Sequence, residues 1–284
     1  MRNSVVANKV LFFFPHKLKM LNKIETKIRN KFVYNGFVIS YPKCGRTWIN
    51  SLLLHYVLRH YDQITEPLPF QWAPPIIRHT WYRRFPNICF THDISSPARP
   101  YYQYNQDFDV SPYITKRCVL LVRDPRDVVV SYYYHARKKT HKNKLPADIS
   151  LNDFCHHDSF GLRPVITFFN IWVPFIQCYP TVTYFRYEDL KANTKAVMEQ
   201  MLSFFGVTKV DSEALDWAIT QTKFERLQER EVYRKSSEGE DTKQDDLRVR
   251  RGKVGGFQDE IDAEEIQYVN EVLNDHLDSI YGYS

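Results

Sequence analysis

One short apolar run, which passes through a proline and a glycine into a helical pattern, constrains this chain most. Residues 36–41 (GFVISY) carry no charge and are typical of a buried strand. Pro42 and Gly45 interrupt the run, and a helix is expected from about Trp48 to Tyr61. Such a strand needs cover on both faces, which helices provide in α/β proteins. The segment therefore predicts a parallel sheet between two layers of helices.

The rest of the chain repeats this alternation. Further strands are expected at 88–91, 117–122 and 182–186, with helices opening at Pro125 and around 195–205. Asp211 and Asp262 are expected to cap two more helices, and Gly282 to end the last. The polar run 236–246 (SSEGEDTKQDD) is expected to be a mobile loop inside the fold. We therefore predict a single three-layer α/β domain over 33–284, preceded by a basic and apolar extension over 1–32.

The extension has two interpretations. Residues 10–14 (VLFFF) are apolar, and Pro15 and a basic stretch follow them. A signal peptide has the opposite order, with its positive charge before a longer apolar run. The segment is then either a helix packed on the domain or an anchor for peripheral membrane contact. No run in the sequence approaches the length of a membrane-spanning helix.

Charge and cysteine usage narrow the partners and the compartment. The net charge of +6 suits an anionic partner. The positive residues are spread along the chain without a basic helix or zinc-finger spacing, so nucleic acid is not the expected partner. The five cysteines lie far apart with no Cys-x-x-Cys pair, which favours reduced thiols and a cytoplasmic location.

The richest segment is 39–48 (ISYPKCGRTW). A strand that turns directly into a helix aims free backbone N–H groups and the positive end of the helix at one point. Lys43 adds a mobile cation and Thr47 adds a hydroxyl. This combination predicts a phosphate site. It is not the P-loop pattern of ATPases, because the segment has one glycine and its lysine precedes that glycine.

This loop and four later segments together resemble the family of sulfotransferases that use 3′-phosphoadenosine 5′-phosphosulfate (PAPS). The loop is similar to the family's P-K-[ST]-G-[TR]-T-W. The second of the five segments is similar to the family's 3′-phosphate motif, in which an arginine precedes a serine by eight residues. The family's Y-E-D-[LM], T-x-F and R-K-G-x-x-G-D-W elements follow in the same order. The corresponding segments here are 123–134 (RDPRDVVVSYYY), 187–190 (YEDL), 222–224 (TKF) and 250–257 (RRGKVGGF).

The resemblance implies a co-substrate and the residues that bind it. The co-substrate would be PAPS, and a metal is not required. The 5′-phosphosulfate would be held by Lys43, Cys44, Gly45, Arg46 and Thr47. The 3′-phosphate would be held by Arg123, Ser131, Arg250, Arg251 and Gly252. The adenine would lie among Trp48, Tyr187, Thr222 and Phe224. Each position also has a structural interpretation, as core packing for the aromatic residues and as surface ion pairs for the arginines.

Sulfuryl transfer to an alcohol needs a base for the hydroxyl proton and positive charge for the leaving oxygen. A neutral histidine is the natural base near pH 7. His92 ends a strand and matches the family's T-H element, which implies that it is the base; His135 is expected on a helix surface. Lys43 is the expected catalytic cation. A thiol at Cys44, at a helix start beside two cations, is expected to have a lowered pKa.

Three departures from the family pattern bear on these expectations. Phe90 stands where a lysine often precedes T-H, Cys44 and Arg46 replace small hydroxyl residues, and 256–257 (GF) replaces Asp-Trp. Two other functions stay open, a nucleotide kinase or NTPase with a variant loop and a non-catalytic nucleotide-binding module. The acceptor is a hydroxyl compound, either a small molecule, a lipid or a carbohydrate. Its pocket is expected from residues 67–84, 141–163 and 236–246.

Overall fold

The computed structural model describes residues 34–67, 85–92, 111–137, 145–146, 148–239, 245 and 247–283, together with the backbone of 76–77. The expected N-terminal extension lies outside these residues, as do parts of the three segments expected to form the acceptor pocket. Within the described residues, no helix combines the length and the apolar character needed to cross a bilayer.

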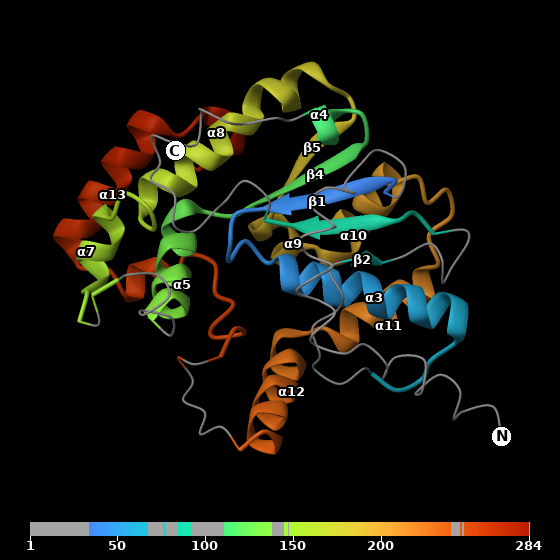
Figure 1. Cartoon of the computed structure of the whole chain (residues 1–284). Helices are drawn as coiled ribbons and strands as arrows, with labels where there is room; N and C mark the ends of the chain where they lie inside the picture. Colours follow the sequence, from blue (N-terminus) through green and yellow to red (C-terminus); the bar gives the residue numbers. More distant parts are fainter. Residues whose placement is uncertain are drawn as a thin grey trace, which may run out of the picture. The chain divides into compact units, whose positions relative to one another are not determined.

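A five-stranded sheet forms the centre of the domain (Figure 1). Its strands lie in the order β2 (Ile76–Ile77), β3 (Ile88–Thr91), β1 (Gly36–Ser40), β4 (Arg117–Val122) and β5 (Val182–Arg186). Four strands are parallel, and β2 pairs antiparallel with β3 at one edge. The four parallel strands confirm the sequence prediction. The short edge strand β2 was not predicted.

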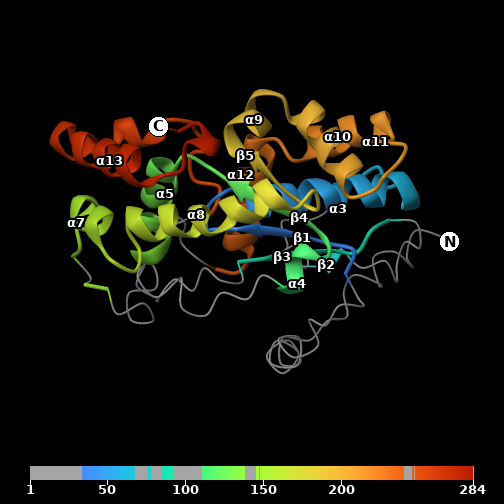
Figure 2. The same ribbon diagram turned by 90° about the horizontal axis from the view of Figure 1, so that it is seen from above.

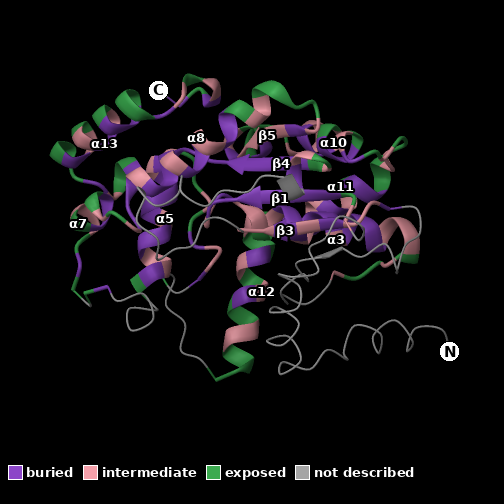
Figure 3. Cartoon of the chain, turned by 45° about the horizontal axis from the view of Figure 1, so that its top comes forward, coloured by how far each residue is buried: buried purple, intermediate pink, exposed green. Residues whose placement is uncertain are grey.

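The central strands are covered on both faces. All five residues of β1 are buried, and so are the last five of β4 (Figure 3). A Cβ added to Gly36 would lie 2.5 Å from the ring of Phe205, just after helix α10. The next side chain, Phe37, packs edge-on against Tyr113 of α4, which packs in turn against Trp172 of α8. Successive side chains of a strand point to opposite faces. Helices α4 and α8 therefore cover one face and α10 the other (Figure 2).

The helices begin and end close to the expected positions. The first of them, α3, starts at Arg46, directly after the glycine. Asp211 caps α11 by accepting the N–H of Ala214 at 3.0 Å, as predicted, and Asp262 precedes α13. The described helices are α3 (Arg46–Asp62), α4 (Ser111–Ile114), α5 (Pro125–Arg137), α7 (Leu151–His156), α8 (Leu162–Cys178), α9 (Tyr187–Ala192), α10 (Thr194–Phe204), α11 (Ser212–Gln221), α12 (Phe224–Ser237) and α13 (Ala263–His276), with the 3₁₀ turns η3 (Gly256–Asp259) and η4 (Ser279–Tyr281).

Two local expectations were wrong in detail. Helix α12 continues to Ser237, so the first two residues of the expected 236–246 loop are helical. Gly282 ends the 3₁₀ turn η4 rather than an α-helix, because α13 already stops at His276. Neither change moves the strand ends that carry the candidate site.

Candidate functional site

Each parallel strand delivers one candidate residue to the same edge of the sheet. Lys43 follows β1, His92 follows β3, Arg123 follows β4 and Tyr187 follows β5. The carboxyl ends of parallel strands lie together, and ligands of α/β proteins bind there. The β1 arrow in Figure 1 points toward α5, which borders this edge. The topology thus brings together side chains that are up to 144 positions apart in the sequence.

The phosphate loop has the backbone of an anion cradle. Lys43 (φ +76°) and Gly45 (φ +92°) both adopt the left-handed region, which is uncommon for lysine. Residues of this kind turn successive N–H groups toward one point, forming a nest. Gly45 precedes α3 and provides no side-chain cap, so the helix N-terminus is available to an anion. A Cβ at Gly45 would lie 2.8 Å from the Tyr187 ring, which excludes a larger residue.

Cys44 corrects a prediction. Its side chain is fully buried in the core, and it is the one predicted donor-binding residue that does not line the cavity. Burial raises the pKa of the Cys44 thiol, and this outweighs the nearby positive charge of Arg123. The prediction of a lowered pKa for the Cys44 thiol is therefore wrong. The turn at Lys43 directs the next side chain inward, so only the backbone of Cys44 is left for a phosphate contact.

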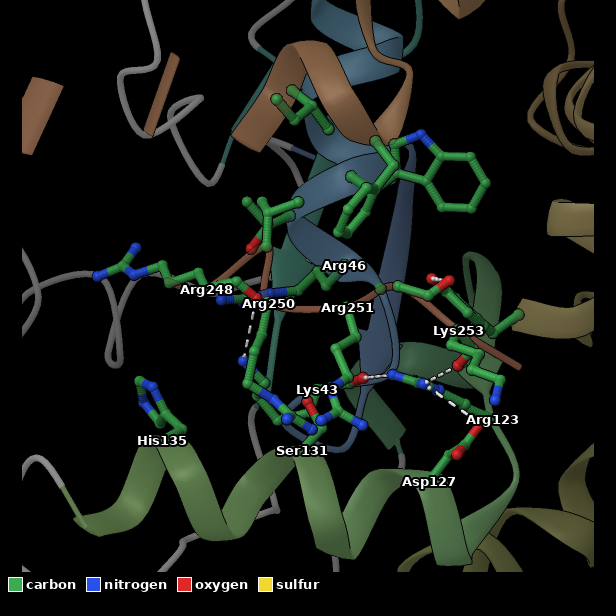
Figure 4. A pocket seen from close by; sticks show the side chains of 18 of the residues that line it. Lys43, Arg46, Arg123, Asp127, Ser131, His135, Arg248, Arg250, Arg251 and Lys253 are labelled. Carbon is green, nitrogen blue, oxygen red and sulfur yellow. Dashed lines mark hydrogen bonds and ion pairs between the residues drawn. The ribbon is translucent and has the colours of Figure 1, made fainter. Parts of the chain in front are cut away.

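The other predicted residues surround one cavity of about 400 Å³ (Figure 4). They come from the loop after β1, the ends of β3, β4 and β5, helices α3, α5 and α12, the end of α11 and the segment before η3. Those lining the cavity are Lys43, Gly45, Arg46, Thr47, Trp48, His92, Arg123, Ser131, Tyr187, Thr222, Phe224, Arg250, Arg251 and Gly252.

Arg123 joins the phosphate loop to the segment after Gly252. Its Nη1 donates to the carbonyl of Lys43 at 3.4 Å, and its Nη2 donates to the carbonyl of Lys253 at 2.9 Å. The same Nη2 lies 3.3 Å from the carboxylate of Asp127, and the guanidinium lies 4.5 Å from the centre of the Tyr187 ring. Nε of Arg123 is buried and has no hydrogen-bond partner among the described residues. A buried donor left in this state is costly, and a bound anion would lower that cost.

Arg250 and Arg251 converge on the carboxylate of Glu260. Arg250 makes two hydrogen bonds with it, at 3.0 and 2.7 Å, and lies 3.9 Å from the centre of the Tyr134 ring. Arg251 lies 3.1 Å from the same carboxylate, but its side chain is 43% exposed. Arg250 is therefore fixed by its partners, whereas Arg251 keeps more freedom to reach a ligand.

An aromatic slot lies beside these cations. Trp48 and Tyr187 pack edge-on with ring centres 5.8 Å apart. Phe224 packs so closely against Gly252 that a Cβ there would lie 2.4 Å from the ring, which explains the glycine. Nζ of Lys191 lies 5.8 Å from the Trp48 ring and 5.9 Å from the Phe224 ring, so it sits between two walls of the slot. The sequence prediction missed Lys191, although it directly follows the YEDL element.

His92 is held in the form that a general base needs. Its Nδ1 lies 2.8 Å from the carbonyl oxygen of Ser40, which can only accept, so Nδ1 carries the hydrogen and Nε2 the lone pair. Burial, which is the largest cause, and the positive charges of Arg46 and Lys43 together lower the pKa of His92 to about 3, against the opposing effect of the hydrogen bond to the Ser40 carbonyl. The imidazole is therefore neutral at pH 7.

Two departures from the family pattern have structural counterparts. Arg46 donates from Nη1 to the carbonyl of Phe90 at 3.3 Å, which places its guanidinium at the end of β3, where the usual lysine is missing. Phe257 is buried under the guanidinium of Arg126, and the carboxylate of Asp127 accepts the N–H groups of Gly255 and Phe257 at 2.9 and 3.0 Å. The loop that carries the departure at 256–257 is thus anchored to α5.

Other lining residues were not predicted, among them His135, Arg248 and Lys253, and the expectation about His135 was wrong. His135 was expected on the helix surface, but it lines the cavity. It lies four positions after Ser131, and this helical spacing could have revealed it. Arg248 and Lys253 also line the cavity, and no sequence signal separates them from the charged run around them. In the described part of the chain, no three His, Cys, Asp or Glu side chains are grouped as metal ligands.

Comparisons with known proteins agree on one family. Residues 35–280 match the model described as a sulfotransferase domain. The chain is 23% identical to flavonol 3-sulfotransferase of Flaveria bidentis, over 85% of this chain and 81% of that protein. It is 22% identical to sulfotransferase 2A2 of Mus musculus, over 90% and 89%. The fold resembles that of mouse sulfotransferase SULT7A1 complexed with PAP (TM-score 0.56, 16% identity, 87% and 86% coverage). It also resembles that of retinol dehydratase in complex with retinol and PAP (TM-score 0.58, 20% identity, 87% and 82% coverage).

Proposed function

The chain belongs to the sulfotransferase family, and from that premise we propose how its own residues bind PAPS and transfer the sulfuryl group. The enzyme moves this group from PAPS to a hydroxyl of an acceptor. The observation that carries the assignment is the pair of anion sites in one cavity, one at the loop of Lys43 and Gly45 and one around Ser131 and Arg251. An aromatic slot lies with them, and the donor has a matching pair of anionic groups on one adenosine.

The donor is bound along the sheet edge. The phosphosulfate accepts hydrogen bonds from the N–H groups of the nest at 43–45, and Thr47 assists. The 3′-phosphate is bound by Ser131, Arg251 and the backbone of Gly252, with the ion-paired Arg123 and Arg250 behind them. The adenine enters the slot of Trp48, Tyr187 and Phe224, with Thr222 at its edge, and Lys191 moves aside.

In the transfer, Nε2 of His92 accepts the proton of the acceptor hydroxyl while that oxygen attacks the sulfur. A new O–S bond forms, and the S–O bond to the 5′-phosphate breaks, leaving its electron pair on the phosphate oxygen. Lys43 stabilises the charge that develops on this leaving oxygen. Arg46 stabilises the transferring group from the β3 side, in place of the usual lysine.

Other parts of the proposal follow from the sequence rather than the cavity. We propose that residues 33–284 form the sulfotransferase domain and that residues 1–32 precede it as an extension that packs on it or contacts a membrane surface. We also propose a cytoplasmic location and a reaction without a metal. A kinase or a non-catalytic nucleotide-binding module is not favoured, because neither explains a second anion site together with a neutral histidine at the first.

The test compares nucleotides and then follows the transfer. The nucleotide 3′-phosphoadenosine 5′-phosphate (PAP) should raise the melting temperature of the protein more than ATP does at equal concentration. The reason is that only PAP carries a 3′-phosphate. PAPS labelled with ³⁵S, incubated with a mixture of phenols, alcohols and oligosaccharides, should then yield a labelled product. Equal stabilisation by ATP and PAP would contradict the assignment of the second anion site.

A further inference from the structure

Positive side chains outnumber carboxylates in the lining of the cavity. Nine lysine or arginine side chains line it, against two carboxylates, among the residues that the structure describes. The cations are Lys43, Arg46, Arg123, Lys191, Arg230, Arg248, Arg250, Arg251 and Lys253, and the carboxylates are Asp127 and Glu260. Two carboxylates outside the lining also pair with its cations, since Asp259 lies 2.6 Å from Lys253 and Asp245 lies 3.7 Å from Arg250. The two anionic groups of the donor account for the cations on the loop and around Ser131. Arg248 is not among them.

Arg248 is held in place through its backbone. The carboxylate of Glu231, which is completely buried, accepts the N–H of Arg248 at 2.9 and 3.0 Å and the N–H of Val249 at 3.0 Å. Gln228 donates to the carbonyl of Val249 at 2.9 Å. These contacts from α12 fix the chain at Arg248. A cation anchored in this way gives a defined binding position rather than a mobile surface charge.

The fixed backbone places Arg248 next to the catalytic lysine. Nζ of Lys43 lies 3.5 Å from the carbonyl oxygen of Arg248. The side chain of Arg248 runs away from that contact, to the side of Lys43 opposite to Arg123 (Figure 4). In the proposed function the donor extends from the loop at Lys43 to the site of Ser131 and Arg251, with Arg123 behind it. The side chain of Arg248 therefore lies beyond the sulfuryl end of the donor, where the acceptor must approach.

His135 lies on the same side of the cavity. Asp127, Ser131 and His135 recur every four residues along α5, so they share one face of that helix, and all three line the cavity. Figure 4 shows His135 on the side of Lys43 where Arg248 lies. The acceptor end of the cavity thus offers a guanidinium and an imidazole.

We propose that the acceptor carries an anionic group, such as a carboxylate, sulfate or phosphate, that Arg248 binds with the help of His135. The proposal rests on the proposed function, since it assigns this end of the cavity to the acceptor. Burial also lowers the pKa of Arg248, which means that its charge is partly desolvated, and an anion would offset this cost.

The test uses two phenols that differ in charge and little in shape, 4-hydroxybenzoate and 4-hydroxybenzamide. Calorimetry first measures PAP binding and then the binding of each phenol to the protein saturated with PAP. In the wild type the benzoate should bind about tenfold more tightly, because it makes a charge-assisted contact. Arg248→Met should abolish the difference and leave PAP affinity unchanged. Arg226→Ala removes a charge from the exposed side of α12, the helix that anchors Arg248, and should keep the difference.

Each other outcome has a defined meaning. Equal affinity for the two phenols, including no detectable binding of either, overturns the proposal. If Arg248→Met weakens PAP instead of the benzoate, Arg248 is a donor contact and the proposal is also wrong. If the wild type does not bind PAP, the proposed function fails, and this inference fails with it. PAP binding without discrimination between the phenols contradicts only the inference.

Discussion

The protonation state of His92 gives the sharpest test of the proposed chemistry. A histidine with its ordinary pKa of about 6.5 would be only about one-tenth neutral at pH 5.5, so a base of that kind would lose roughly tenfold in rate between pH 7.5 and 5.5. Burial and the charges of Arg46 and Lys43 lower the pKa of His92 to about 3. The neutral form then persists through this range, and kcat/KM for PAPS should stay nearly constant.

The perturbation is Arg46→Gln, which removes one of the two cations that lower this pKa. Protonated His92 then meets less repulsion, so its pKa rises and the acid limb of kcat/KM moves to higher pH. His92→Gln should instead lower kcat by about 10²–10⁴-fold at every pH, because the base is absent. The acid limb that belongs to His92 should disappear in that variant.

The assay needs a readout other than rate, because Arg46 is also a proposed contact of the transferring group. NMR of ¹⁵N-labelled histidine should show neutral His92 with its hydrogen on Nδ1 at pH 5.5, and a higher titration midpoint in Arg46→Gln. Circular dichroism at each pH checks that the protein stays folded. A tenfold loss of wild-type kcat/KM between pH 7.5 and 5.5, or an unchanged midpoint in Arg46→Gln, would refute the reasoning.

Three further predictions address the donor site, the loop and the acid stability. Arg251→Gln should weaken PAP by about tenfold and leave adenosine 5′-phosphosulfate nearly unaffected in a binding titration, because only PAP has the 3′-phosphate; equal losses would contradict the assignment. Iodoacetamide followed by peptide mass spectrometry should modify the exposed Cys178 and spare the buried Cys44, with or without PAP; modification of Cys44 at the rate of Cys178 would contradict its burial. Burial lowers the pKa of His55 to about 4, so the unfolded chain binds a proton below about pH 6.5 that the folded protein takes up only near pH 4. Lowering the pH from 7 to 5 should therefore cost roughly 2 kcal/mol of unfolding free energy through this residue, and urea titrations of His55→Gln should show a correspondingly smaller loss.

The strands were predictable because each is a continuous apolar run, as in 117–122, and parallel strands buried on both faces have that pattern. The strand β2 has two residues and pairs at an edge, so it leaves no periodic signal. Most of the site followed from motifs whose members lie at strand ends. The orientation of the Cys44 side chain could not be predicted, because it depends on the left-handed backbone conformation of Lys43. A sequence gives no reason to expect that conformation in a lysine.

The ion pairs in the cavity divide its arginines into two groups. Arg123 and Arg250 are nearly buried and already hold Asp127 and Glu260, so much of their charge is balanced before a nucleotide binds. Such pairs fix geometry, and removing one partner leaves a costly buried charge. Arg251 and Arg248 are less buried than Arg250 and retain more capacity to respond to a ligand. The motif arginines 123 and 250 therefore build the frame of the cavity. We therefore expect the more accessible arginines next to them to contribute most to the recognition of donor and acceptor.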